Sequence, residues 1–162
     1  MIKKILIALL VLFVLVQFYR PARNHSGDKT HDIATKFPVP DSVAEVLGRA
    51  CYDCHSNNTR YPWYAEVQPV NYWLSGHIKD GKRHLNFNNF TAMTAARQKK
   101  RMDDCMEQLD NGEMPLESYT WIHKDAILSP AEKAMLKGWC QGVIDSLKAR
   151  YPADSLVLPK RK

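Results

Sequence analysis

The chain has 162 residues, which is enough for one domain of ordinary size and too few for two large ones. Its formal net charge of +6 first suggests a nucleic-acid-binding protein, but the charge is not on the expected domain. Residues 41–150 contain 14 Lys and Arg and 14 Asp and Glu, so the positive excess lies in the two flanks. Binding a phosphate backbone needs basic residues gathered on the folded surface, so we expect no nucleic-acid partner.

The N-terminus combines two lysines with one apolar run. Lys3 and Lys4 precede residues 5–16, all of them apolar, and the chain reaches Tyr19 before the next charge. This layout is typical of a secretory signal, but no small-residue cleavage site follows it. We therefore predict an uncleaved signal anchor over residues 1–20, in the bacterial inner membrane, with the remainder of the chain in the periplasm. The alternative is a cleaved signal peptide and a soluble periplasmic protein.

Residues 21–40 are polar, contain three prolines and show no periodicity, which predicts a linker. The folded domain is expected over residues 41–150, followed by a basic tail over residues 151–162. Within the domain, apolar residues recur at helical spacing and no segment alternates as a strand does. We therefore predict an all-α fold.

Capping residues place the expected helices. The first begins at Ser42 or one residue earlier, because Ser42 opens a capping box. A short helix over residues 70–79 and a longer one over residues 91–110 should follow, the longer one stopped by Gly112. The last begins at a second capping box, at Ser129.

The motif Cys-Tyr-Asp-Cys-His follows the first expected helix. Two thiols at this spacing can each add across one vinyl group of a porphyrin, and a histidine directly after the second thiol then faces the iron. C-x-x-C-H is the attachment motif of c-type haem. The sequence therefore predicts one covalent haem c, attached at Cys51 and Cys54, with His55 as the proximal iron ligand.

Other uses of this motif fit less well. A zinc ribbon normally pairs two C-x-x-C knuckles, and a thioredoxin-like redox pair lies in a βαβ unit. A plain disulfide between Cys51 and Cys54 would leave His55 without a role.

The distal face of the iron has three candidate ligands. Met114 precedes Pro115 in a polar loop, where it does not fit the core-filling role expected of the other methionines. A thioether opposite a histidine is the ligand pair of electron-transferring cytochromes c. We favour Met114 and keep His77 and His84, either of which would give bis-histidine ligation, as alternatives.

A haem also needs an apolar wall and donors for its two propionates. Arg60 and Arg83 are the candidate propionate partners, because a guanidinium matches a carboxylate bidentately. The wall is expected from the aromatic stretch that follows the motif, namely Tyr61, Pro62, Trp63, Tyr64 and Trp73.

Cys105 and Cys140 fall on the apolar faces of two expected helices. In an oxidising compartment they could form a disulfide, which the chain-entropy model values at about 3–4 kcal/mol for a loop of this length. The alternative is two unpaired thiols that pack as small apolar side chains.

Two longer runs carry a family resemblance: CYDCHSNNTRYPWYAEVQPVNYWLSGHIKDGKRHLNF and GEMPLESYTWIHKDAILSPAEKAMLKGW. They resemble the bacterial haem-binding domain family, single-CxxCH domains found alone behind an N-terminal anchor or fused to other modules. The resemblance spans about residues 41–148. It implies a small cytochrome c-like domain with haem at Cys51, Cys54 and His55, and Met114 matches the family's Met-Pro pattern.

The leading hypothesis is a membrane-tethered electron carrier that exchanges electrons with redox partner proteins. With both axial positions filled the iron has no open site, and no nucleophile, paired carboxylates or phosphate loop indicates a second chemistry, so we do not expect an enzyme. The alternative is a five-coordinate haem sensor or a peroxidase-like protein, in which Met114 is off the iron. His77, His84 or His123 would then be a distal polar group.

Overall fold

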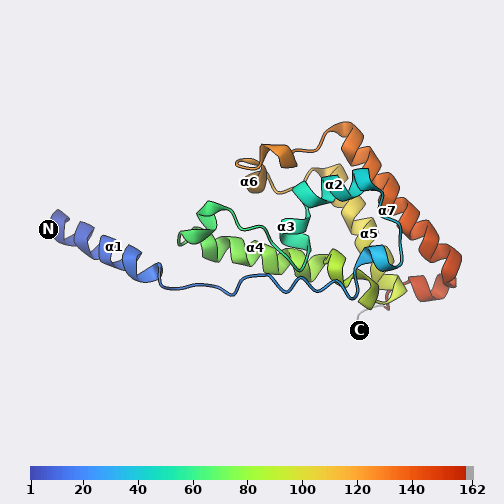
Figure 1. Cartoon of the computed structure of the whole chain (residues 1–162), viewed down its shortest axis with the longest axis horizontal. Coiled ribbons are helices and arrows are strands. Elements are labelled where there is room, and N and C mark those ends of the chain that lie inside the picture. The colour runs from blue at the N-terminus through green and yellow to red at the C-terminus, as the bar shows by residue number, and fades with distance from the viewer. Residues whose placement is uncertain (160–162) are drawn as a thin grey trace.

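Within residues 1–159, the part of the chain that the structure describes, a computed structural model contains helices and no strand, so the predicted all-α fold is confirmed. Figure 1 shows a domain formed by α2 to α7, with α1 standing apart from it. The α-helices are α1 (Ile2–Val16), α2 (Asp41–Ala50), α3 (Tyr52–His55), α4 (Val70–His84), α5 (Ala95–Asn111), α6 (Glu117–Thr120) and α7 (Pro130–Arg150). Short 3-10 helices connect or follow them: η1 (Ile33–Thr35), η2 (Trp63–Glu66), η3 (Phe87–Ala92), η4 (Lys124–Ala126) and η5 (Ala153–Leu156).

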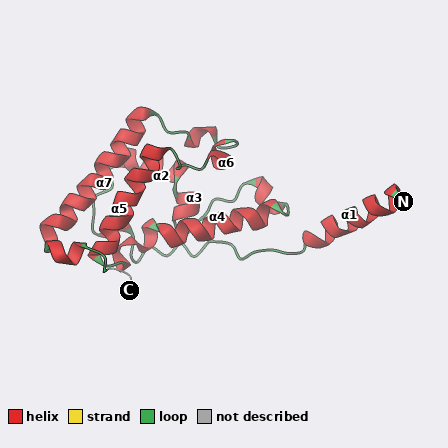
Figure 2. Ribbon diagram, turned by 180° about the vertical axis from the view of Figure 1, so that it is seen from behind, coloured by secondary structure: helices red, strands yellow, loops and turns green. Residues whose placement is uncertain are grey.

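The centre of the domain is the contact between α5 and α7, which lie side by side (Figure 2). Their facing surfaces bury Met102 and Leu109 from α5 with Leu136 and Ile144 from α7. α2 packs on α7 and adds Leu47 to the same core. Each such side chain contributes about 1.5–3 kcal/mol on burial, so this three-helix contact is a substantial part of the hydrophobic core.

Two helix ends follow the predicted signals. At the start of α7 the Ser129 hydroxyl accepts a hydrogen bond from the Glu132 N–H, and the Glu132 carboxylate accepts the Ser129 N–H at 2.8 Å, which confirms the capping box. α5 stops at Gly112, whose φ of 70° lies in the left-handed region that glycine tolerates.

α2 begins at Asp41, one of the two predicted starts, but without the predicted capping box. The Pro40 carbonyl accepts the Ala44 N–H at 2.9 Å, so the helix begins at Asp41 with no side-chain cap. Ser42 therefore lies inside the first turn, and the capping box expected there is wrong.

The extents of α4 and α5 also differ. α4 runs to His84 rather than to residue 79, and its last turn is basic, which suits the negative end of a helix dipole. α5 begins only at Ala95, capped by Thr94, because the preceding Phe87–Ala92 forms η3.

The expected linker over residues 21–40 lies along the domain. Ile33 and Phe37 are buried in its main core, and the Asn24 amide donates a hydrogen bond to the Ser56 carbonyl at 2.9 Å. This segment is therefore part of the folded unit. Two apolar residues among polar ones produce no periodic signal, which is why the sequence presented it as a linker.

The two ends of the chain complete the fold. α1 has no buried residue, and none of the helices in residues 1–159 is both long enough and apolar enough to cross a membrane. In the expected basic tail, η5 buries Leu156 against the core. The basic residues at positions 160–162 lie outside the described residues.

Candidate functional site

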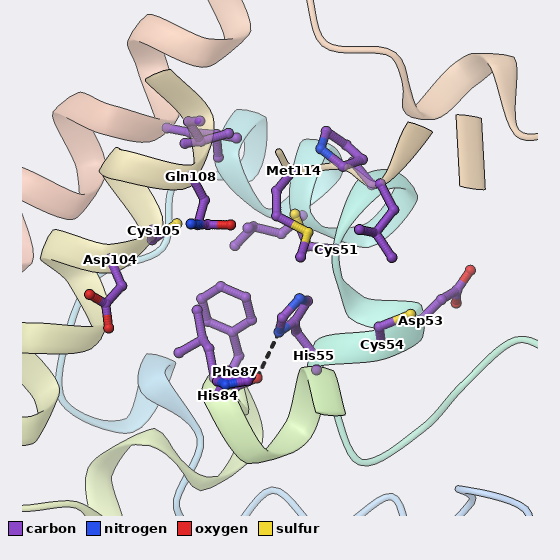
Figure 3. Close-up of a pocket in the computed structure, with 18 of the residues that line it drawn as sticks. Cys51, Asp53, Cys54, His55, His84, Phe87, Asp104, Cys105, Gln108 and Met114 are labelled. Carbon is purple, nitrogen blue, oxygen red and sulfur yellow. Dashed lines mark hydrogen bonds between the residues drawn. The ribbon is translucent and has the colours of Figure 1, made fainter. Parts of the chain in front are cut away.

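A cavity of about 500 Å³ lies between α3, α4, α5 and α7, beside the loop that follows α5 (Figure 3). Its volume falls within the roughly 300–1,000 Å³ of small-molecule and cofactor sites. Leu47, Phe87, Leu136 and Trp139 contribute to an apolar wall. The residues that the sequence marked for ligand and thiol chemistry all line it: Cys51, Cys54, His55, His77, His84, Cys105, Met114 and Cys140.

The orientation of His55 is set by a backbone acceptor. Nδ1 of His55 lies 2.8 Å from the Leu85 carbonyl oxygen, which can only accept, so Nδ1 carries the proton and donates it (Figure 3). In a neutral imidazole this leaves Nε2 with its lone pair available for a metal. Burial lowers the pKa of His55, which favours this neutral ring.

Phe87 supports the same imidazole from the side. Its ring is 2% exposed and lies edge-on to the His55 ring, with 6.5 Å between the centroids. The Phe87 ring also packs near the rings of Tyr52 and Trp139, with centroid separations of 5.6 and 6.1 Å. Leu85 and Phe87 therefore give a physical reason for the Leu-Asn-Phe run that the family resemblance includes.

The approach of α4 to α3 depends on Gly81. A Cβ atom added to Gly81 would lie 2.7 Å from the Cys54 carbonyl oxygen and 3.1 Å from Cys54 Cβ. Only a residue without a side chain permits this contact, so Gly81 lets α4 pack close to the second motif cysteine.

The two motif cysteines are poor thiolates in the folded chain. Burial raises the pKa of Cys51, and burial followed by the charge of Asp53 raises the pKa of Cys54 to about 11. At neutral pH both are thiols facing an apolar cavity, which suits bonding to an apolar ligand better than binding a cation.

The three candidate distal ligands approach the cavity from two sides. His77 and His84 belong to α4, the helix that packs on α3 and thus on the element that carries His55. Met114 comes from the loop that Gly112 starts, after α5. Figure 3 shows Met114 and His55 entering the cavity from opposite sides.

Asp53, inside the motif, is a buried carboxylate with two partners. Arg60 Nε donates to its Oδ1 at 3.1 Å, and the Tyr119 hydroxyl donates to its Oδ2 at 2.8 Å. Burial and this hydrogen bond raise the pKa of Tyr119. Because Tyr119 belongs to α6, the carboxylate joins the motif to the segment that follows Met114.

The predicted propionate partners and aromatic wall are not at the cavity. Arg60 is engaged with Asp53 and Arg83 with Asp80, and neither lines the cavity, whereas Arg101 does. The aromatic wall comes instead from Phe87, Tyr119 and Trp139, which are distant from the motif in sequence. None of the five expected wall residues lines the cavity: Tyr61, Pro62, Trp63, Tyr64 and Trp73.

Cys105 of α5 and Cys140 of α7 meet at the cavity wall. A hydrogen bond between their thiols lowers the pKa of Cys105, and the same bond raises the pKa of Cys140. Both are free thiols in the structure, so the disulfide stays a prediction.

A buried amide network, which the sequence analysis missed, fixes the loops around the motif. Asn57 N–H donates to Asn88 Oδ1 at 2.7 Å, and Asn86 Nδ2 donates to Asn57 Oδ1 at 2.8 Å. All three asparagines are buried, which costs free energy unless they are hydrogen-bonded. Asparagines repeated within aromatic stretches are the signal that could have revealed them.

Comparisons with known proteins agree with this geometry. No curated protein and no solved structure matches the chain. A family model described as "Haem-binding domain" matches residues 11–142, which is most of the chain and includes every residue named for the cavity. The chain therefore belongs to the haem-binding domain family, and its cofactor is haem.

Proposed function

We propose that this protein is a mono-haem c-type cytochrome that carries electrons in the periplasm of a bacterium, tethered to the inner membrane by α1. Cys51 and Cys54 would hold the haem through two thioethers, each thiol supplying one C–S and one C–H bond to a vinyl group without an oxidant. His55 would be an iron ligand through Nε2. When bound, haem supplies a one-electron couple between ferric and ferrous iron.

The observation that carries this proposal is the His55–Leu85 hydrogen bond. It fixes the tautomer and the ring orientation that a proximal ligand needs, at the residue directly after the second cysteine. Cys51 and Cys54 line the same cavity as His55, and much of the cavity wall around them is apolar.

Met114 is the distal ligand in this proposal. It lines the cavity from the side opposite His55 in Figure 3, whereas both rival histidines belong to α4, which packs on the helix that carries His55. Met93, Met106 and Met135 pack against the core and Met102 is buried in it, but Met114 does not join that core. A thioether opposite histidine raises the reduction potential relative to bis-histidine ligation, which suits an electron carrier.

The remaining site residues shape the haem environment. Arg101, which pairs with Asp104 at 3.2 Å, and Gln108 line the cavity and are the candidate donors for the propionates. With His55 and Met114 holding the iron, electrons would pass to redox partner proteins without bonds being made at the metal, so no catalytic residue is assigned.

The membrane tether rests on α1. Its apolar side chains are all exposed, and contact between that much apolar surface and water is unfavourable in free energy. Fifteen residues span about 22 Å at 1.5 Å per residue, which is less than the roughly 30 Å of a hydrocarbon core. α1 is therefore proposed as an inserted tether.

The test uses the full chain produced in bacteria that mature c-type haem. Haem that stays with the chain after denaturation, and is lost from Cys51→Ala with Cys54→Ala, supports covalent attachment. The ferric protein should be low-spin and show the weak far-red band of a thioether-ligated haem. Met114→Ala should abolish that band, lower the reduction potential and let carbon monoxide bind, while Met114→His should keep the iron low-spin at a lower potential.

His77→Ala and His84→Ala are the matched controls and should leave the spectrum unchanged. A changed spectrum in either control, with an intact one in Met114→Ala, would replace the distal ligand and keep the electron carrier. High-spin iron that binds carbon monoxide in the unmutated protein would favour the sensor or peroxidase-like alternative. A chain that releases its haem on denaturation would not be a c-type cytochrome.

A further inference from the structure

Large apolar and aromatic side chains are exposed together at the end of the domain nearest α1. We name this set the aromatic end: Trp63 in η2, Tyr72 and Trp73 in α4, and Trp121 and Ile122 directly after α6. Trp63 is 77% exposed and Trp121 is 65% exposed. Indole rings at such exposure mark an interaction surface when they occur together.

The aromatic end is held in place by hydrogen bonding and ring contacts. The Tyr64 hydroxyl and His123 Nε2 lie 2.8 Å apart, which joins η2 to the segment after α6. The His123 ring stacks on Tyr119, with 4.3 Å between centroids and 17° between planes. Trp63 packs edge-on against Tyr64, and Trp121 and Ile122 immediately precede His123. The exposed rings thus stand on a fixed base.

α1 joins the domain at this same end, with no spacer. The helix ends at Val16, and Gln17 exchanges two hydrogen bonds with the Gln68 backbone, at 2.9 and 3.3 Å. The Tyr19 ring lies 6.1 Å from the Tyr72 ring of the aromatic end. Figure 1 shows α1 projecting away from the domain beyond the start of α4.

Charged groups at the junction suit the lipid headgroup region. Arg20 donates to the Glu66 carbonyl at 2.7 Å, and Arg23 pairs with the Glu66 carboxylate. The Glu66 carboxylate is therefore paired with Arg23 and lies 4.0 Å from Arg20, so the acidic group at the junction is balanced by arginines, which are also attracted to lipid phosphates.

We propose that the aromatic end rests in the headgroup region of a lipid bilayer and orients the domain on the membrane, an inference that depends on the proposed tether. Because α1 is shorter than the hydrocarbon core and carries no spacer, its insertion draws the adjoining surface down to the headgroups. Tryptophan and tyrosine prefer that layer, where the ring is dehydrated and its polar atom stays hydrated. Tyr119 lines the haem cavity and stacks on His123, so the cavity also lies close to the membrane-facing end.

The test is fluorine NMR of the haem-loaded full chain labelled with 5-fluorotryptophan, in phosphatidylcholine nanodiscs with and without a gadolinium-chelate lipid. The signals of Trp63, Trp73 and Trp121, assigned by single Trp→Phe variants, should be broadened or lost when the gadolinium lipid is present. Trp139, which is buried in the wall of the haem cavity, is the internal control and should keep its signal when the haem is held in its diamagnetic, low-spin ferrous state. Tyr151→Trp adds an exposed indole after α7, at the end of the domain away from α1, and that signal should also persist.

Flotation of the nanodisc complex separates two failures. A chain that does not float with lipid loses the tether, and the docking proposal with it. If the chain floats with lipid, but the gadolinium lipid broadens the signals of Trp63, Trp73 and Trp121 no more than the signal added by Tyr151→Trp, the tether is retained and the docking proposal is overturned. Broadening that follows protein concentration and ignores the gadolinium lipid would assign the aromatic end to a second copy of the chain and overturn the proposal as well.

Discussion

The Tyr119 hydroxyl meets the Asp53 carboxylate at 2.8 Å, although the two residues are 66 positions apart in the chain. Asp53 lies between the two motif cysteines, and Tyr119 comes five residues after Met114. This hydrogen bond therefore ties the proximal side of the cavity to the loop that carries the proposed distal ligand.

Tyr119→Phe should loosen that loop without removing an apolar ring. A hydrogen bond to a charged acceptor contributes about 1.5–3 kcal/mol, so the free energy of unfolding should fall by up to that amount. Carbon monoxide should bind the ferrous protein faster than in the unmutated chain, as measured by stopped-flow absorbance. Tyr61→Phe is the control, because Tyr61 accepts the Asn24 N–H away from the cavity. Equal carbon monoxide rates in the two variants would refute the link to Met114.

Gly81→Ala should disturb the contact between α3 and α4. The new methyl group would meet the Cys54 backbone at 2.7 Å, and overpacking of this kind costs about 1–3 kcal/mol. Gly76→Ala in the same helix has open space around the added methyl and should stabilise the protein by about 0.5–1 kcal/mol. Denaturant unfolding of both variants, followed by circular dichroism, checks the opposite signs. A stabilising Gly81→Ala would mean that α3 and α4 lie further apart than described.

The thiols of Cys105 and Cys140 should be bridged in the mature protein. The denatured, oxidised, haem-loaded chain should then contain no alkylatable cysteine by mass spectrometry, and Cys105→Ser should expose one. Reduction should lower the free energy of unfolding by about 3–4 kcal/mol in the chain-entropy model. Two alkylatable cysteines in the unmutated chain would instead leave a pair of buried thiols.

Residues 1–20 should remain in the mature protein and hold it to membranes. Leu9→Lys with Leu12→Glu places charges in the middle of α1, each costing about 2.5–3.5 kcal/mol in a bilayer, and should release the protein into the soluble fraction. Leu9→Ala with Leu12→Ala is the apolar control and should stay bound. N-terminal sequencing that begins after residue 20, together with full solubility, would establish a cleaved signal peptide.

Local chemistry made part of this site predictable. Cys51, Cys54 and His55 could be predicted to share one site because they lie within one motif, and all three line the cavity. α7 could be placed because its capping box spans four consecutive residues. The end of α5 could likewise be predicted at Gly112, because glycine tolerates the positive φ that ends many helices.

The other parts of the site could not be predicted, because they depend on tertiary contacts. The carbonyl that orients His55 belongs to Leu85, and any residue could supply a carbonyl, so no residue type signals it. The aromatic residues nearest the motif were expected to form the cavity wall, but Trp63 in η2 is exposed, and the wall is built by Phe87 from η3 and Trp139 from α7. Proximity in sequence is a poor guide wherever a wall is assembled from separate helices.

If the chain is the proposed c-type cytochrome, the hydrogen bond between His55 and Leu85 separates thioether formation from iron coordination in time. Cys51 and Cys54 lie close together along the chain, so both thioethers can form on a segment that has not yet folded. The imidazole acquires its orientation only when a carbonyl 30 positions later arrives beside it. In the proposed cytochrome, covalent attachment of haem could thus precede folding, whereas iron coordination by His55 would require the α3–α4 contact, and the visible absorption spectrum of the folding protein would record the order of the two events.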